Sequence, residues 1–254
     1  MNLPLFWIQV KDLTVASLKS RYRKTWAGFV WVILNPLLMF GVQSLVFKRF
    51  LGLQIPDYYL FLLGGLLPWI FMSSTIQMGT PIFVTQAQLL RSFKINPMVL
   101  LAAQVLDNFL NFLTSFFLIL IPFYVASDRS LSLLLLLPIA LLPLLIGTLA
   151  ITISLAVLNV FYRDINFVMG FVFSLMFFLT PIFYSREYIP QQFQFMVDYN
   201  PLVYFIAPFH SLIYDNSVGG FFLDLILGMG MAILFVVLAL VVWKRKQNAF
   251  YYKL

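Results

Sequence analysis

Apolar residues fill long stretches of the chain, and charged residues fall almost entirely between these stretches. A bilayer core of about 30 Å needs about 20 consecutive apolar residues in a helix. Stretches of this length that lack Asp, Glu, Lys and Arg, with Asp107 as the one interruption, predict six transmembrane helices. Their approximate limits are residues 26–48, 58–82, 98–124, 131–157, 165–184 and 222–243.

The segment 186–218, between the last two predicted spans, contains an apolar and aromatic stretch at 199–214 that is broken by Pro201, Pro208 and His210. It is too interrupted to cross a bilayer. Short apolar pieces of this kind predict re-entrant or interfacial helices, whose irregular backbone is tolerated where protein covers it. An ordinary surface loop is the alternative.

Residues 4–24, before the first span, have a moderate amphipathic pattern. Trp7, Val10, Thr14 and Leu18 fall on one helical face, and charged residues fall on the other. A basic helix of this kind with a Trp is typical of the membrane interface. A simple topology anchor is the alternative.

Six spans place both termini on one side of the membrane, together with 12 of the 16 Lys and Arg residues. The positive-inside rule assigns that side to the cytoplasm. We therefore expect a multi-pass protein of a bacterial cytoplasmic (inner) membrane with both termini cytoplasmic, the bacterial origin resting on a resemblance described below.

Composition agrees with an all-α integral membrane protein. Hydrophobic residues make up 62% of the chain and charged residues 10%, against roughly 45–50% and 25% in soluble domains. The net charge of +7 is spread between apolar runs rather than gathered on one face, so we expect contact with membrane lipid and no nucleic acid.

The chain lacks the motifs of common catalytic and nucleotide-binding sites. It has no cysteine, which excludes a thiolate nucleophile, and no G-x-x-x-x-G-K-[ST] loop to cradle a nucleotide. The single histidine, His210, has no residues near it in sequence that would complete a triad or a metal site. We therefore expect no enzyme, no metal and no cofactor in this chain.

Asp107 is the one acid deep within a predicted span, and Gln104, Asn108 and Asn111 accompany it at helical offsets of three and four. Ionisable groups at such positions mark a translocation path or an interhelical hydrogen bond. Asp107, Asn108 and Asn111 are candidates for lining a channel, and a hydrogen-bonded packing stripe is the alternative. A second polar stripe, Ser73, Gln77 and Thr80, is more typical of helix packing.

Aromatic residues recur at helical spacing in the fifth predicted span, at Phe167, Phe171 and Phe178. Their rings are candidates for stacking on sugars along a channel. Packing against lipid or against the protein core is the alternative.

Several motifs carry a family resemblance. The stretch Asp12 to Pro36, D-L-T-V-A-S-L-K-S-R-Y-R-K-T-W-A-G-F-V-W-V-I-L-N-P, resembles the N-terminal region of polysaccharide-export ABC transporter permeases. The resemblance continues through N-V-F-Y-R-D-I at 159–165, L-T-P-I-F-Y at 179–184 and N-P-L at 200–202. This family of permeases includes the exporters of O-antigen and teichoic acid.

The resemblance implies a homodimer with a channel at its interface. Two separate ABC ATPase subunits, which hold the ATP and Mg, would drive export of an undecaprenyl-linked glycan. Residues 85–96 would form a cytoplasmic coupling helix, with contacts to the ATPase from Gln88, Arg91, Phe93 and Lys94. The basic segment Arg21, Tyr22, Arg23 and Lys24 would meet the substrate pyrophosphate, a group that Arg can bind in bidentate fashion. Anchoring by the positive-inside rule explains the same bases.

The expected function is therefore the transmembrane subunit of an ATP-driven exporter that moves a lipid-linked polysaccharide, such as O-antigen, to the periplasm. A permease of the same class for capsule, teichoic acid, lipid or drug is the nearest alternative. A membrane enzyme acting on polyprenyl lipids and a proton-coupled carrier that uses Asp107 are the others.

Overall fold

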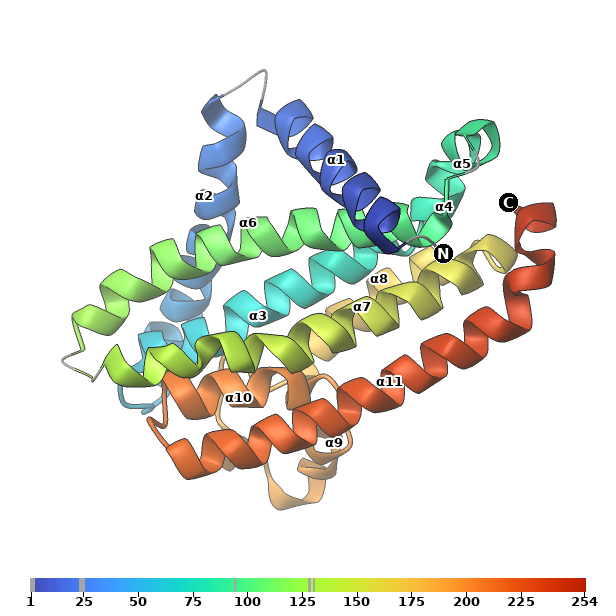
Figure 1. Ribbon diagram of the computed structural model, residues 1–254. Coiled ribbons are helices and arrows are strands. Elements are labelled where there is room, and N and C mark those ends of the chain that lie inside the picture. Colours follow the sequence, from blue (N-terminus) through green and yellow to red (C-terminus); the bar gives the residue numbers. More distant parts are fainter. Residues whose placement is uncertain (1–2, 23–25, 94, 128, 130) are drawn as a thin grey trace.

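The computed structural model describes residues 3–22, 26–93, 95–127, 129 and 131–254, and for residues 21–22 and 26–29 it describes the backbone alone. The described residues form helices and connecting loops without a strand, which confirms the all-α prediction (Figure 1). The long helices form a bundle. We call its two ends the α5 end, which also holds the C-terminus, and the α10 end.

Five helical segments in the described residues are long and apolar enough to cross a membrane. They correspond to five of the six predicted spans. They are α2 (Trp26–Ser44) continued by the π-helical turn η1 (Leu45–Phe50), α3 (Tyr58–Gly79), α6 (Pro97–Val125), the 3-10 turn η2 (Leu131–Leu136) with α7 (Leu137–Phe161), and α11 (Val218–Lys253).

The central helix of the bundle is α3. Of the apolar window in α3, 78% is buried, against 11% in α2 and 17% in α11. A span that is apolar on all sides suits either protein or lipid, so its position in the bundle decides which one it contacts. The apolar faces of α2 and α11 lie open on this single chain, as expected of surfaces that meet lipid or another chain.

The remaining predicted span, 165–184, contains a shorter helix than expected. Helix α8 (Ile165–Leu179) has 15 residues, about 22 Å at a rise of about 1.5 Å per residue. It ends because Pro181 disfavours helical backbone at Thr180, which is extended at φ −96° and ψ 132°.

Extended backbone continues the path of α8 toward the α10 end. Trp69, midway along α3, packs against Phe173 of α8, and Tyr58 at the start of α3 donates a hydrogen bond of 2.9 Å to the carbonyl of Phe183. Close contact is possible because Gly65 has no side chain: a Cβ there would lie 3.1 Å from backbone atoms of Ile182. Segment 165–184 therefore follows α3 over much of its length.

Helix α1 (Leu3–Tyr22) occupies the segment in which the interfacial helix was predicted and packs along the first half of α6 (Figure 1). Val10 and Thr14 form its buried face, and the Thr14 hydroxyl donates to the carbonyls of Val10 and Ala103. Trp7 is exposed. The interfacial location of α1 remains a prediction.

Short helices cap both ends of the bundle. At the α5 end, α4 (Ile82–Thr85) and α5 (Ala87–Phe93) project beyond α3 (Figure 1). At the other end lie the 3-10 turns η3 (Arg186–Tyr188) and η4 (Gln191–Phe193), then α9 (Phe195–Asp198) and α10 (Val203–Ile213). The short helices of the predicted segment 186–218 are thus present, and whether they re-enter a membrane remains a prediction.

Candidate functional site

One face of α8 is packed and the opposite face is open. Phe173 is 3% exposed, whereas Phe167 is 78%, Phe171 66% and Phe178 61% exposed. The predicted aromatic stripe therefore does not pack into the core of this chain. It forms a continuous apolar surface that a lipid, a second chain or a ligand can contact.

A groove of about 300 Å³ lies beside this stripe, where α2, α3 and α8 meet. Its residues come from all three helices. They are Met39, Trp69, Ile70, Ser73, Gln77, Phe173, Ser174, Phe177 and Phe178.

Aromatic rings form one wall of the groove. The ring centroid of Trp69 lies 6.0 Å from that of Phe173 and 5.9 Å from that of Phe177. These spacings are typical of tilted aromatic pairs. The wall therefore has several rings at positions set by packing against α3.

The groove has few polar groups, and they differ in whether they are already hydrogen-bonded within the chain. The Ser73 hydroxyl donates to the carbonyl of Ile70 at 3.4 Å, and that of Ser174 donates to the carbonyl of Gly170 at 2.9 Å. Gln77 is exposed, and its amide makes no hydrogen bond to the part of the chain that the structure describes. Gln77 can therefore offer both a donor and an acceptor to a hydroxyl-rich ligand.

The second candidate set, Asp107, Asn108 and Asn111, lies elsewhere. The Ser17 hydroxyl of α1 donates to Asp107 Oδ2 at 3.3 Å, and Asn108 Nδ2 donates to the Thr75 hydroxyl of α3 at 3.4 Å. Asp107 is fully buried. This arrangement matches the packing-stripe alternative, and a channel-lining role for these residues remains a prediction.

Helix α5 has one anchored side and one open side. Leu90 is 1% exposed and belongs to an apolar cluster with Phe83 and Phe250. Gln88, Arg91 and Phe93 are exposed around it. Three of the four predicted ATPase contacts are thus exposed at the α5 end, and Lys94 lies outside the described residues.

The predicted pyrophosphate-binding segment begins at the end of α1. Arg21 and Tyr22 form its last residues, with only their backbone described. Arg23 and Lys24 lie outside the described residues. Their predicted role is therefore untested.

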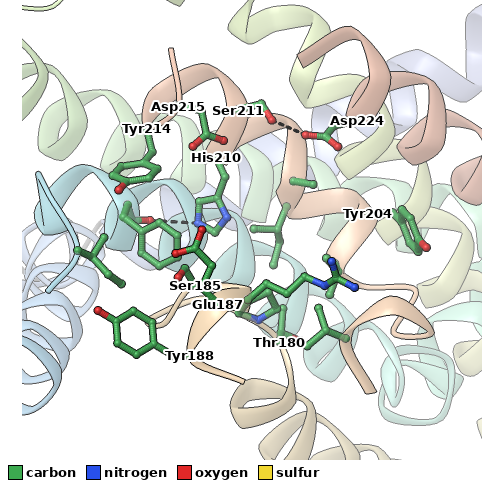
Figure 2. Close-up of a pocket in the computed structure, with 18 of the residues that line it drawn as sticks. Thr180, Ser185, Glu187, Tyr188, Tyr204, His210, Ser211, Tyr214, Asp215 and Asp224 are labelled. Carbon is green, nitrogen blue, oxygen red and sulfur yellow. Dashed lines mark hydrogen bonds between the residues drawn. The ribbon is translucent and has the colours of Figure 1, made fainter. Parts of the chain in front are cut away.

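At the α10 end, α10 and α11 form an open cleft of about 960 Å³ with the loops after α2 and α8. His210 of α10 lies in it and donates from Nε2 to the carbonyl of Phe61 at 3.1 Å, with its ring stacked on the Phe61 ring (Figure 2). The sequence indicated no role for His210, and its contacts are those of a structural histidine. The cleft itself was not predicted.

The α3 side of the groove was not predicted from the sequence. Ser73 and Gln77 line the groove, although their pattern in the sequence favoured helix packing, and nothing in the sequence analysis pointed to Trp69. A period of four residues from Trp69 through Ser73 to Gln77 places them on one helical face. That signal was available in the sequence, but it did not reveal that α8 leaves this face open.

Comparison with known proteins identifies related transporters. A profile of the ABC-2 type transporter family matches residues 8–214. An O-antigen export system permease protein of Klebsiella pneumoniae is 31% identical over 240 residues, which are 94% of this chain and 93% of that protein.

Two further relatives extend the comparison. An O-antigen export system permease protein of Myxococcus xanthus is 31% identical over 82% of this chain and 80% of its own length. A polysialic acid transport protein of Escherichia coli is 22% identical over 78% of both chains.

Proposed function

This chain belongs to the ABC-2 type transporter family, and from that premise we propose that it is the transmembrane subunit of an ATP-driven exporter of a lipid-linked polysaccharide. The names of its similar proteins support this class of cargo: two are O-antigen export permeases, at 31% identity. The proposed cargo is an undecaprenyl-linked O-antigen that moves from cytoplasm to periplasm.

The observation that carries the proposal is the groove between α2, α3 and α8. Trp69 and Phe177 provide rings, Gln77 provides a free amide, and Phe178 continues the aromatic surface along α8. Rings and sparse polar groups suit a sugar chain, whose faces carry C–H groups and whose edges carry hydroxyls.

The groove is open on one side, so a second copy is needed to enclose a path. The exposed stripe Phe167, Phe171 and Phe178 borders it and supplies an apolar surface for that copy. We propose a homodimer in which the two α8 stripes face each other and the two grooves together form the channel.

The partner at the α5 end is proposed to be an ABC ATPase. Two of its subunits would bind ATP and Mg, because this chain lacks a nucleotide-binding motif. Leu90 anchors α5 to the bundle, and Gln88, Arg91 and Phe93 project from it. A short anchored helix with an exposed face can transmit the movement of a partner to the bundle.

Charge supports the proposed orientation, with six crossings and both termini in the cytoplasm of a bacterial inner membrane. Bases at the α5 end, such as Arg91, Arg163 and Lys244, are exposed. The side opposite the predicted cytoplasmic loops holds four bases, Lys48, Arg49, Arg129 and Arg186, of which the last two are each paired with an aspartate.

A second candidate function, export of another polysaccharide such as a capsule glycan, is favoured by the relative named for polysialic acid transport. The two candidates share the fold and the mechanism. Polysialic acid carries a carboxylate on each sugar, so the cargo of this second candidate would be anionic.

The absence of cysteine from the chain allows a direct test of the dimer. Phe171→Cys, on the open face of α8, is expected to give a disulfide-linked dimer on mild oxidation in membranes. Ile233→Cys is the matched control, since Ile233 is 57% exposed on α11, a helix outside the proposed interface. Cross-linking through Ile233→Cys and not through Phe171→Cys would contradict the proposed interface.

Native mass spectrometry of the gently extracted chain tests the assembly. The expected particle holds two copies of the chain, two ATPase subunits and a lipid-linked glycan. A solitary chain that transports or reacts without ATPase partners would contradict the exporter.

A further inference from the structure

The cleft at the α10 end has the size and lining of a ligand site. Its volume of about 960 Å³ is at the upper end of the roughly 300–1,000 Å³ found for small-molecule sites. A ligand of several sugar units would fit this volume. The proposed export path through the groove does not account for this cleft.

Tyrosines line the cleft on more than one side. Figure 2 shows Tyr188 and Tyr214 on one side and Tyr204 on the other, with His210 between them. Two of the hydroxyls are held in place: Tyr188 Oη accepts from the backbone N–H of Gln54 at 2.9 Å, and Tyr204 Oη donates to the carbonyl of Asp198 at 2.9 Å. Fixed tyrosine rings offer stacking faces at little entropic cost.

Two carboxylates in the cleft are available to a ligand. Glu187 and Asp215 make no side-chain hydrogen bond or ion pair with the described residues, whereas Asp198 pairs with Arg186 at 2.7 Å and Asp224 accepts from the Ser211 hydroxyl. Carboxylates accept hydrogen bonds from hydroxyls in up to four directions. Glu187 and Asp215 can therefore each bind more than one sugar hydroxyl.

The balance of charge in the cleft selects against anions. The lining includes four carboxylates and one guanidinium, and that guanidinium is already paired. Burial and the neighbouring Asp224 raise the pKa of Asp215, against the lowering effect of Arg129. A bound anion would add a like charge beside these carboxylates, which is unfavourable.

The cleft lies next to the proposed channel. Phe178 lines the groove and Thr180 lines the cleft, so a single residue of chain, Leu179, separates the two linings. Beyond Thr180, the ring of Phe183 returns to within 6.0 Å of the ring of Phe178. A glycan that emerges beside the last turn of α8 would therefore reach the cleft within a short distance.

We propose that the cleft is a saccharide-binding site that receives a neutral, hydroxyl-rich stretch of the glycan after it leaves the groove. This inference rests on the proposed export function and specifies the class of cargo. Tyrosine faces hold the sugar rings, and Glu187 and Asp215 accept hydroxyl protons. A polyanionic glycan is excluded by the same carboxylates.

Saturation-transfer NMR on the full chain, assembled with its ATPase in lipid nanodiscs, tests the site. The probes are a neutral mannose tetrasaccharide and a sialic acid tetramer. We expect binding of the neutral probe at least tenfold tighter than binding of the anionic probe. Tyr188→Ala is expected to weaken neutral binding about tenfold by removal of a stacking face.

A double variant, Glu187→Gln with Asp215→Asn, tests the charge argument. It keeps the size of both side chains, and we expect it to reduce the preference for the neutral probe at least fivefold. Tyr252→Ala is the control, because Tyr252 is exposed at the opposite end of the chain. It should bind both probes as the unsubstituted protein does.

Failure of this inference is distinguishable from failure of the export function. Absence of neutral binding, equal binding of both probes, or binding unchanged in the cleft variants would overturn the cleft as a saccharide site. A deletion strain that still displays its surface polysaccharide would overturn the export function instead.

Discussion

Phe250, near the C-terminus, packs edge-on against Phe83 of α4, with the ring centroids 5.3 Å apart and the planes at 86°. Both rings are fully buried. The contact joins the last turns of α11 to the segment that leads into α5. The C-terminal residues are therefore part of the platform that positions α5.

Phe250→Ala is expected to loosen this platform. Removal of a buried Phe costs roughly 3–5 kcal/mol, and the loss should be local because Phe250 lies at the edge of the bundle. Amide hydrogen exchange in residues 82–93 should accelerate at least tenfold, and glycan export should fall. Tyr252→Ala, which removes a ring that is 90% exposed, should change neither. Equal protection of residues 82–93 from amide hydrogen exchange in both variants would contradict a role of Phe250 in positioning α5.

Gly228→Ala is expected to destabilise the bundle. A Cβ at Gly228 would lie 2.6 Å from the Tyr204 carbonyl oxygen, so α11 and α10 would have to separate. Overpacking of this kind costs about 1–3 kcal/mol. Gly230→Ala is the matched control, since nothing lies within 4 Å of its Cβ position on the same helix. Thermal denaturation in detergent should give a lower midpoint for Gly228→Ala alone.

Gln77→Leu is expected to reduce export without loss of folding. The change removes the available amide from the groove, and the loss of a typical hydrogen bond, about 0.5–1.5 kcal/mol, corresponds to roughly a twofold to tenfold effect. Surface glycan per unit of inserted protein is the measurement. Gln247→Leu, at an exposed position of α11 near the C-terminus, should export normally. Normal export by Gln77→Leu would show that the groove does not contact the cargo through this residue.

Two Arg–Asp pairs at the α10 end should differ in strength. Arg129 pairs with Asp57 at 2.8 Å and also donates to the carbonyls of Ile213 and Tyr214, with a side chain 19% exposed. Arg186 pairs with Asp198, and its side chain is 56% exposed.

Arg129→Gln is therefore expected to cost about 1–3 kcal/mol, since it leaves part-buried acceptors without a partner. Arg186→Gln should cost less than about 1 kcal/mol, as is usual for exposed pairs. Denaturation of both variants under identical detergent conditions is the measurement. A larger loss of unfolding free energy in Arg186→Gln than in Arg129→Gln would contradict this ranking of the two pairs.

The main outlines of the fold followed from local properties of the sequence. Span limits depend on the length of apolar runs, and Asn96 followed by Pro97 marks the start of α6, where the Asn96 side chain accepts from the N–H of Met98. The helical content of 186–213 was predicted on the same basis. The early end of α8 was less apparent, although Pro181 was its signal.

The candidate site was only partly predictable. Helical periodicity grouped Asp107 with Asn108, and Ser73 with Gln77, but periodicity does not reveal which neighbour a helical face meets. Tertiary packing placed Asp107 and Asn108 against α1 and α3 and left Gln77 open to the groove.

Helical content, location in a membrane and family resemblance could all be inferred from the amino-acid sequence, because hydropathy, charge and the order of motifs are properties of the chain along its length. Three features became apparent only in the folded chain: α3 is the core, Phe167, Phe171 and Phe178 are open, and α10 and α11 line an open cleft. The physical reason is that burial depends on contacts between segments distant in sequence, and apolar faces that pack against protein or lipid have the same local pattern.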